Sequence, residues 1–167
     1  MSSRIILTLQ EVDENELARA LKPVEHTHQS GRKEIVTSPT FWLLRRMKKL
    51  KFCVFHRGKF DDTKVYTIQD IMFDPKYGLD GAIPEKVTFE KKMPDGTTQT
   101  TTVAKHYKDT YGFRLEYPRL PLIRSTRGGL FPMELCNVAQ NQRYPFKLSP
   151  DQVSYVAFKL LLFLANS

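Results

Sequence analysis

The sequence is poor in cysteine, which narrows the class of protein. Only two cysteines, Cys53 and Cys136, occur among 167 residues, and they lie far apart with no C-x-x-C pair. This argues against a disulfide framework and against a cysteine-based zinc site. We expect both cysteines to be reduced and buried as small apolar side chains.

No apolar run is clearly long enough to span a membrane. The longest apolar run, residues 153–165, is interrupted by Lys159. A run of this length is more typical of a packed helix than of a membrane span. Ser149 and Pro150 are typical of the start of that helix, which we place at 149–167.

The first residues lack the apolar core of a signal peptide. We therefore expect an intracellular protein, cytoplasmic or nuclear, without a membrane partner.

Acidic residues are outnumbered by basic ones. The 26 Lys and Arg residues against 18 Asp and Glu residues leave a net charge of +8. This balance favours a polyanionic partner, although many basic proteins bind no nucleic acid. The chain is long enough for one ordinary domain, and its 41% hydrophobic content is sufficient for a core.

The first 38 residues predict a strand-helix segment followed by a linker. Residues 4–9 have the character of a strand, and Asp13 with Glu16 three residues later has the spacing of a helix-capping box. Pro23 ends this helix.

Residues 26–39 are polar and lack apolar periodicity, so we predict a loop or linker there. His26 and His28 lack further metal ligands nearby, and we interpret them as loop residues. No metal or cofactor is therefore expected. We place a domain boundary near Ser38, with the main domain at 39–148.

Between Lys48 and Val138 the pattern predicts about seven short strands and one small helix. Residues 87–92 and 97–102 form a hairpin signal around the turn Pro94-Asp95-Gly96. A helix at 102–111 follows, and Gly112 can end it in the left-handed conformation. We expect a mainly β (α+β) fold, a small β-barrel carrying a hairpin-plus-helix insertion and flanked by helices.

Residues 111–138 contain the most specific motif. Phe113, Leu115 and Tyr117 alternate as in a short strand, and a Tyr-Pro-x-Leu-Pro step follows at 117–121. Another apolar strand, a Gly-Gly turn and a strand ending in Glu-Leu-Cys-Asn at 134–137 complete it. The sequence of this segment closely resembles the C-terminal half of the PAZ domain of Argonaute proteins, the module that holds the 3′ end of a small guide RNA. The resemblance extends over residues 50–148.

The resemblance implies a barrel of the oligonucleotide-binding type, with a cleft between the barrel and the insertion. Phe89 corresponds to the aromatic platform for the terminal nucleotide, and Phe131 to an apolar residue of the same pocket. The side chains that correspond to phosphate-binding groups are His56, Tyr66 and Tyr111.

Two departures from the family pattern stand out. His106 and Thr110 occupy positions where the family has a Tyr followed four residues later by a Lys, which removes one cation. Lys64 stands where an Arg is usual.

General chemistry also supports a role for these residues in RNA binding, although less specifically than the resemblance. A stacked base contributes about 1 to 3 kcal/mol, and phenol and imidazole groups suit a phosphate. Phe89 could instead pack back on the barrel, and Tyr111 could end the helix against the core, as Tyr107 is expected to do. Arg119, Arg124 and Arg127 either follow the RNA backbone or form a solvated basic face.

An enzyme is the less favoured interpretation. Metal-assisted cleavage needs converging carboxylates. Asp61, Asp62, Asp70 and Asp74 have no supporting His or Glu motif, and turns are where Asp is common anyway.

We therefore predict a non-enzymatic module that anchors the single-stranded 3′ end, or two-nucleotide overhang, of siRNA- or miRNA-like guides in RNA silencing. Other Argonaute domains or silencing proteins are further expected partners. Two alternatives stay open: the PAZ domain of a Dicer-type protein, and a PAZ-like barrel that serves as a protein-interaction scaffold.

Overall fold

The computed structural model describes residues 3–4, 14–56 and 59–139, and the side chains of 16–54 and 64–139 within them. The predicted helix at 149–167, the predicted strand beyond Arg4 and the capping role of Asp13 lie outside this part of the chain. The domain boundary near Ser38 stays a prediction. Within the described residues, no helix has both the length and the apolar character needed to cross a membrane.

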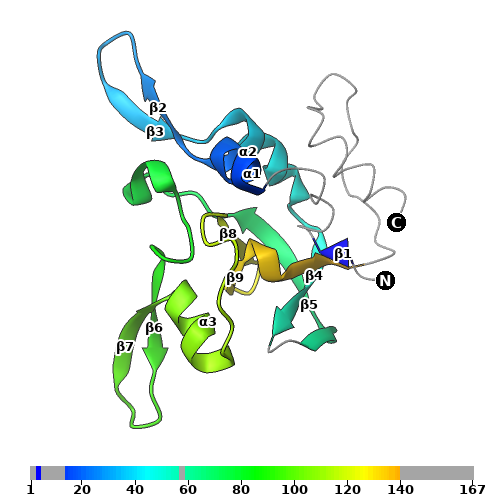
Figure 1. Cartoon of the computed structure of the whole chain (residues 1–167). Helices are drawn as coiled ribbons and strands as arrows, with labels where there is room; N and C mark the ends of the chain where they lie inside the picture. Colours follow the sequence, from blue (N-terminus) through cyan, green and yellow to red (C-terminus); the bar gives the residue numbers. More distant parts are fainter. Residues whose placement is uncertain (1–2, 5–13, 57–58, 140–167) are drawn as a thin grey trace.

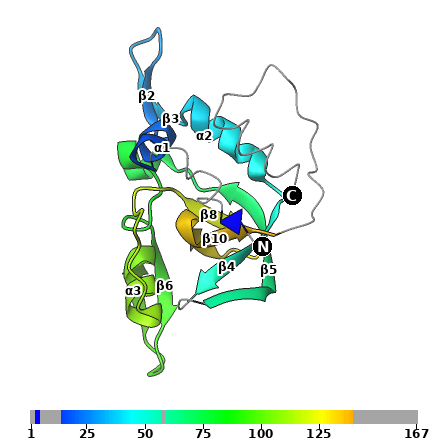
Figure 2. The same ribbon diagram turned by 45° about the vertical axis from the view of Figure 1, so that its right-hand side comes forward.

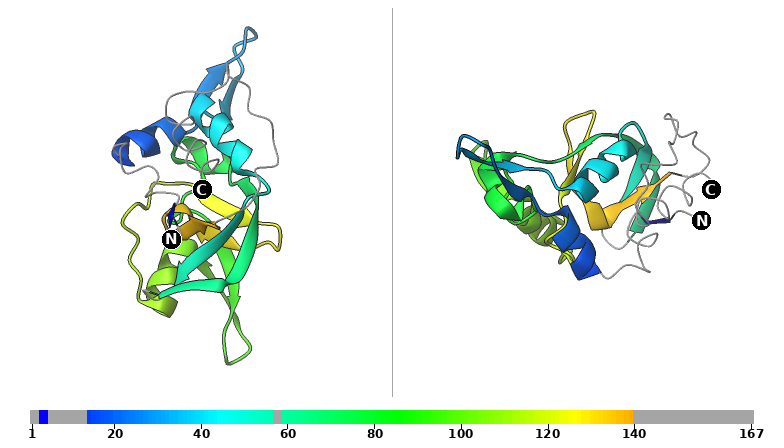
Figure 3. Two further views of the ribbon diagram at one scale, coloured as in Figure 1. Left: turned by 90° about the vertical axis from the view of Figure 1, so that its right-hand side faces the viewer. Right: turned by 90° about the horizontal axis from the view of Figure 1, so that it is seen from above.

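Six antiparallel strands form the main sheet, in the order β1-β10-β4-β5-β8-β9 (Figure 1). They are β1 (Ser3–Arg4), β10 (Cys136–Val138), β4 (Lys51–His56), β5 (Lys59–Ile71), β8 (Leu122–Ser125) and β9 (Leu130–Pro132). The long strand β5 pairs with β4 and then, further along, with β8. Its curved course is visible in Figure 3.

Two register shifts interrupt the ladders of β5, one between Cys53 and Val54 of β4 and one between Ile68 and Asp70 of β5. Such bulges bend the strands and increase their twist. No ladder joins β1 to β9 among the described residues. The predicted α+β class is confirmed, and the strands are mostly antiparallel, whereas closure into a barrel is not detected in the described part of the chain.

The predicted insertion is present. Strands β6 (Thr88–Lys92) and β7 (Thr98–Thr102) form a separate hairpin, and α3 (Val103–Tyr111) follows directly. The Thr102 hydroxyl accepts a hydrogen bond from the Lys105 N–H and caps the helix. Gly112, with φ 65°, ends it in the left-handed conformation that glycine adopts without strain.

The loop predicted at 26–39 is wrong. Strands β2 (Val24–Thr27) and β3 (Lys33–Val36) pair there as a hairpin, and Gly31 turns the chain with φ 80°. Most of its side chains are exposed, so the hairpin has no apolar alternation by which to recognise it. Ion pairs, such as that of Lys33 with Glu25 at 2.9 Å, bridge its strands instead.

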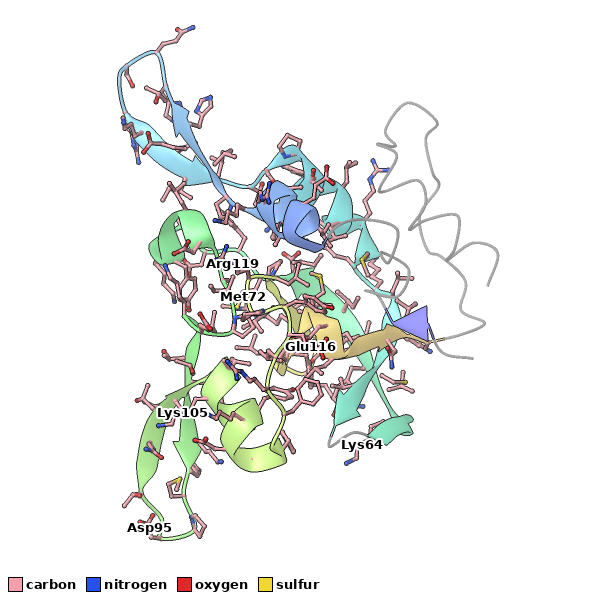
Figure 4. The ribbon with its side chains drawn as sticks, viewed as in Figure 1. Lys64, Met72, Asp95, Lys105, Glu116 and Arg119 are labelled. Carbon is pink, nitrogen blue, oxygen red and sulfur yellow. The ribbon has the colours of Figure 1, made fainter. Side chains whose placement is uncertain are left out.

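The strand predicted at Phe113, Leu115 and Tyr117 is also wrong. These residues alternate in burial but join no ladder. Glu134, in the short helix η4 (Met133–Leu135), accepts hydrogen bonds from the N–H groups of Glu116 at 2.9 Å and Tyr117 at 3.2 Å. Figure 4 shows Glu116 close to this helix. A buried carboxylate therefore replaces the missing neighbouring strand as hydrogen-bond acceptor.

Helices α1 (Glu14–Leu21) and α2 (Pro39–Leu44) lie side by side above the sheet, as Figure 2 shows. Ser38 links them, because its hydroxyl donates to the Ala20 carbonyl at 2.6 Å and accepts from the Phe41 N–H at 3.2 Å. Two 3-10 helices complete the fold, η2 (Arg45–Met47) after α2 and η3 (Pro75–Asp80) after β5.

One hydrophobic cluster unites these helices with the sheet and with α3. Leu17 and Phe41 belong to it together with Phe52, which is fully buried. Cys53 and Cys136 are buried and are not joined in a disulfide, as predicted. Burial raises the pKa of the Cys136 thiol well above its ordinary value, so that side chain stays a neutral, apolar group.

Replacing Glu134 with Ala tests its role as an acceptor for the 116–117 backbone. We expect unfolding by urea to show a stability loss of about 1 to 3 kcal/mol, because two amide groups lose their partner inside the protein. Glu116→Ala is the matched control, since that side chain is exposed. Equal losses in the two variants would contradict the proposed role.

Candidate nucleic-acid interface

A cleft of about 350 Å³ separates the insertion from the main sheet. Residues of β6 and α3 form one wall, and residues of β5, β9 and the turn before β9 form the other. The lining residues are Phe89, Val103, His106, Tyr107 and Tyr111 on the insertion side, and Tyr66, Gly128, Gly129, Leu130 and Phe131 on the sheet side.

The sheet wall is a small aromatic stack. The rings of Tyr66 and Phe131 lie 4.7 Å apart between centroids, and each lies 5.6 Å from the buried ring of Phe52. Phe131 is almost fully buried, whereas Tyr66 is half-buried. Phe52 therefore anchors both rings, and Tyr66 is the member that reaches the cleft with a hydroxyl group.

The insertion wall is a second aromatic cluster. The His106 ring contacts Phe89 edge to face at 5.2 Å and Tyr111 at 5.6 Å. Tyr107 packs against Tyr111 at 5.3 Å and is buried, as predicted. Burial raises the pKa of the Tyr107 phenol far above its ordinary value, so this hydroxyl stays protonated.

A chain of polar groups lies behind His106. The Lys91 ammonium group donates to the Thr110 hydroxyl at 2.9 Å, and that hydroxyl lies 3.1 Å from Nδ1 of His106. Burial, and secondly the charge of Lys91, lower the pKa of His106, while Asp109 opposes the shift. The imidazole is therefore neutral at physiological pH.

This chain restricts the polar contacts of His106. Lysine can only donate, so the Thr110 oxygen accepts from Lys91. The Thr110 hydroxyl also has a proton and a second lone pair, so Nδ1 of His106 accepts from it in one tautomer and donates to it in the other. In the tautomer that accepts at Nδ1, the uncharged imidazole carries its N–H at Nε2.

Lys91 is a residue that sequence reasoning missed. The family pattern has a lysine on the helix at the position of Thr110. Here Lys91, on β6, places its ammonium group beside the Thr110 hydroxyl instead. Alternation along β6 was the available signal, because Phe89 and Lys91 are two apart and share the partly buried face of that strand. The charge missing from the helix is present on the adjoining strand.

The Gly128-Gly129 turn shapes the sheet side of the cleft. The Gly129 N–H donates to the Ser125 hydroxyl at 3.0 Å. A Cβ atom at Gly129 would lie 2.8 Å from the Phe131 ring, closer than side chains tolerate. Glycine at this position therefore permits the observed place of Phe131.

Five of the predicted site residues meet at this cleft: Tyr66, Phe89, His106, Tyr111 and Phe131. Lys64 is exposed on β5 and is not one of the lining residues, and Figure 4 shows it on the strand away from the insertion. The backbone of His56 ends β4, but its side chain lies outside the described residues.

The three predicted arginines are dispersed. Arg119 lines a separate small crevice with Asp80, and Figure 4 shows it beside Met72. Arg124 is exposed on β8. The Lys76 backbone N–H chiefly lowers the pKa of Asp74, and the charge of Arg124 adds a small contribution. Arg127 is exposed and directly precedes Gly128 of the cleft, which makes it the nearest of the three in sequence to the lining.

A known protein family matches most of this chain, including the residues that line the cleft. The model of the PAZ domain matches residues 21–157. The chain therefore belongs to the PAZ domain family. A PAZ domain is a non-catalytic module, so the family match supports the expectation that residues 21–157 have a binding role and no catalytic one.

Argonaute proteins are among the similar curated sequences. Protein argonaute of Schizosaccharomyces pombe is 29% identical over 134 residues, which cover 78% of this chain and 15% of that protein. Nuclear RNAi defective-3 protein of Caenorhabditis elegans is 36% identical over 80 residues, covering 46% of this chain and 8% of that protein. The chain thus spans only a small part of the length of these relatives.

Among solved structures, Drosophila Piwi matches with a TM-score of 0.40 at 18% identity, over 70% of this chain and 16% of that one.

The polar chain behind His106 makes a prediction for NMR titration. The imidazole should titrate below its ordinary pKa of 6.5. Lys91→Met should raise that pKa only part of the way, because the Lys91 charge is removed while burial, the larger cause, remains. Lys92→Met is the control, since Lys92 is exposed on the other face of β6. Identical titration curves for the two variants would rule out the contact.

Proposed function

We propose that the cleft holds the single-stranded 3′ end of a small guide RNA in RNA silencing. The observation that carries this proposal is the convergence of a half-buried aromatic ring, Phe89, with the polar groups of Tyr66, His106 and Tyr111 around one cleft. Its volume of about 350 Å³ falls within the range of ligand-binding pockets.

Stacking supplies the first part of the binding. A terminal base exposes its aromatic face, and Phe89 contributes a ring at the edge of the hairpin, backed by His106 at 5.2 Å. Such stacking contributes about 1 to 3 kcal/mol per base and tolerates any sequence. The site therefore recognises an end and not a base identity.

Hydrogen bonds to the last phosphate and sugar supply the second part. The hydroxyl groups of Tyr66 and Tyr111 are suitable donors for phosphate oxygens, and so is the imidazole of His106 in its Nε2–H tautomer. A terminal 2′-hydroxyl offers a further donor and acceptor, which favours RNA over DNA. His56 and Lys64 keep their proposed phosphate roles as hypotheses.

Electrostatic attraction supplies the third part. Lys91 places a positive charge behind His106, and the chain carries a net charge of +8. Basic groups favour phosphates through counterion release and make the affinity depend on salt. Arg119, Arg124 and Arg127 are proposed contacts to the RNA backbone outside the cleft.

The names of the relatives support a role in silencing, because one is an argonaute protein and another is named for nuclear RNAi. We propose that this chain acts in the cytoplasm or nucleus and associates with other Argonaute domains or silencing proteins. The closed barrel of the oligonucleotide-binding type also stays part of this proposal.

An Argonaute-type module is favoured over a Dicer-type one. Strands β8 and β9 are joined by a tight turn, with the Gly128 N–H bonded to the Ser125 carbonyl at 2.9 Å. This connection contains no long basic insertion. The scaffold alternative depends on an exposed helix at 153–164, which lies outside the described residues.

A titration by fluorescence anisotropy tests the function. The ligands are an RNA duplex with a two-nucleotide 3′ overhang, a blunt RNA duplex, and the overhang duplex made of DNA. We expect the RNA overhang to bind most tightly, because only it presents an unpaired 3′ nucleotide with a 2′-hydroxyl. Equal affinity for all three would leave only nonspecific charge attraction.

Phe89→Ala tests the platform with the same assay. We expect overhang binding to weaken by about 1 to 3 kcal/mol, with little change in salt dependence, because stacking is lost while the charges remain. Trp42→Ala is the matched control, since this indole is 65% exposed on α2 outside the cleft. If both variants bind like the parent, Phe89 is not the platform.

Gly129→Ala tests the shape of the sheet wall. The added methyl group displaces the Phe131 ring, so we expect a stability loss of about 1 to 3 kcal/mol together with weaker overhang binding. In a Phe131→Leu background the ring that clashes is absent, so thermal unfolding should show a smaller loss for Gly129→Ala than in the parent. An equal loss in the two backgrounds would contradict the steric explanation.

A further inference from the structure

We infer that the β2–β3 hairpin contains a binding site for a divalent transition metal ion of the zinc class, formed by His26, His28 and Glu34. Each of these side chains offers one ligand atom, and the three atoms all lie within 4.8 Å of one another. This corrects the expectation from sequence that the two histidines lack a further ligand.

Strand pairing brings these residues together. His26 and His28 are two apart, so alternation places them on one face of the hairpin. Glu34 is the register partner of His26 across the ladder and therefore shares that face. The backbone continues to pair beyond β2, because the His28 N–H donates to the Arg32 carbonyl at 2.8 Å. The ladder thus positions all three side chains.

The distances require only small adjustments for coordination. Nε2 of His28 lies 3.1 Å from Oε1 of Glu34, and the two imidazole rings stand edge to face with centroids 4.8 Å apart. Ligand atoms around a tetrahedral zinc ion at about 2.0 to 2.1 Å are roughly 3.4 Å from each other. His26 and Glu34 are exposed and His28 is half-buried, so their side chains can rotate without disturbing the core.

The donor set selects the class of ion. Two imidazoles and one carboxylate suit Zn²⁺ and its neighbours, whereas Mg²⁺ and Ca²⁺ prefer oxygen ligands. Three protein ligands leave a fourth position for water or for an oxygen of another molecule. The site is therefore expected to be open.

The surrounding charges are compatible with a bound cation. Glu34 contributes the negative charge, and Lys33 projects to the other face of the hairpin, where it pairs with Glu25 at 2.9 Å. Arg32 follows the turn on the face of the ligands by alternation, and its charge reduces the affinity without occupying a ligand position.

The site is separate from the candidate RNA cleft. Hairpins β2–β3 and β6–β7 project at opposite ends of the molecule (Figures 1 and 3), and none of the three ligands lines the cleft. A bound ion would link β2 to β3 and stabilise this hairpin, because the three ligand atoms converge only when the strands pair.

Isothermal titration calorimetry of the full chain with ZnCl₂, in a buffer containing excess MgCl₂, tests the inference. We expect one zinc ion per chain. Removing any one ligand should weaken zinc binding by more than about tenfold, because even the loss of a residue that only supports a ligand has an effect of about this size. The three variants are His26→Ala, His28→Ala and Glu34→Gln.

Glu25→Gln is the matched control for Glu34→Gln, because it removes a carboxylate from the opposite face of the same hairpin. NMR signals of the His26 and His28 rings should shift at the same zinc equivalent. Absence of zinc binding by the parent chain, or equal affinity in the Glu34→Gln and Glu25→Gln variants, would overturn the site.

Discussion

Burial of the Phe52 ring is the constraint on which the candidate site depends. Phe52 lies in the centre of the core and contacts both Tyr66 and Phe131, so it holds the sheet wall of the cleft in one arrangement. On the other side, the buried residues Val103 and Tyr107 dock α3 against the same core. Two walls fixed to one core leave a cleft that does not require a ligand to form it, and preorganisation of this kind lowers the cost of binding.

Electrostatics within the cleft depend on cooperation between the two parts of the insertion. The helix carries a histidine and a threonine, and the neighbouring strand supplies the lysine that orients them. A neutral imidazole is the result, because burial and the adjacent ammonium group both lower the pKa of His106. A cation held behind a neutral donor combines attraction for phosphate with a directional hydrogen bond. This arrangement is compatible with the proposed binding of an RNA end.

Local chemistry explains which elements could be predicted. The β6–β7 hairpin and α3 were predicted correctly, because a Pro-Asp-Gly turn, a threonine cap and a C-terminal glycine are local signals. Hairpin β2–β3 was missed because exposed polar pairs stabilise it without apolar alternation. Residues 113–117 do alternate, yet the N–H groups of Glu116 and Tyr117 bind the Glu134 carboxylate, which lies seventeen or eighteen positions further along. Alternation reports which side chains are buried, and it does not report what the backbone binds.

By itself, the sequence determined the α+β class, the inserted hairpin and helix, the buried cysteines, and the aromatic residues that resemble the PAZ pattern. Only the tertiary structure decided that Tyr66, Phe89, His106, Tyr111 and Phe131 share one cleft, that Lys64 does not line it, and that Lys91 reaches Thr110. It also brought Glu34 to His26 and His28. The physical reason is the range of the interactions. Caps, turns and alternation depend on neighbours in the chain, whereas a cleft or a ligand set depends on residues that only packing and strand register bring together.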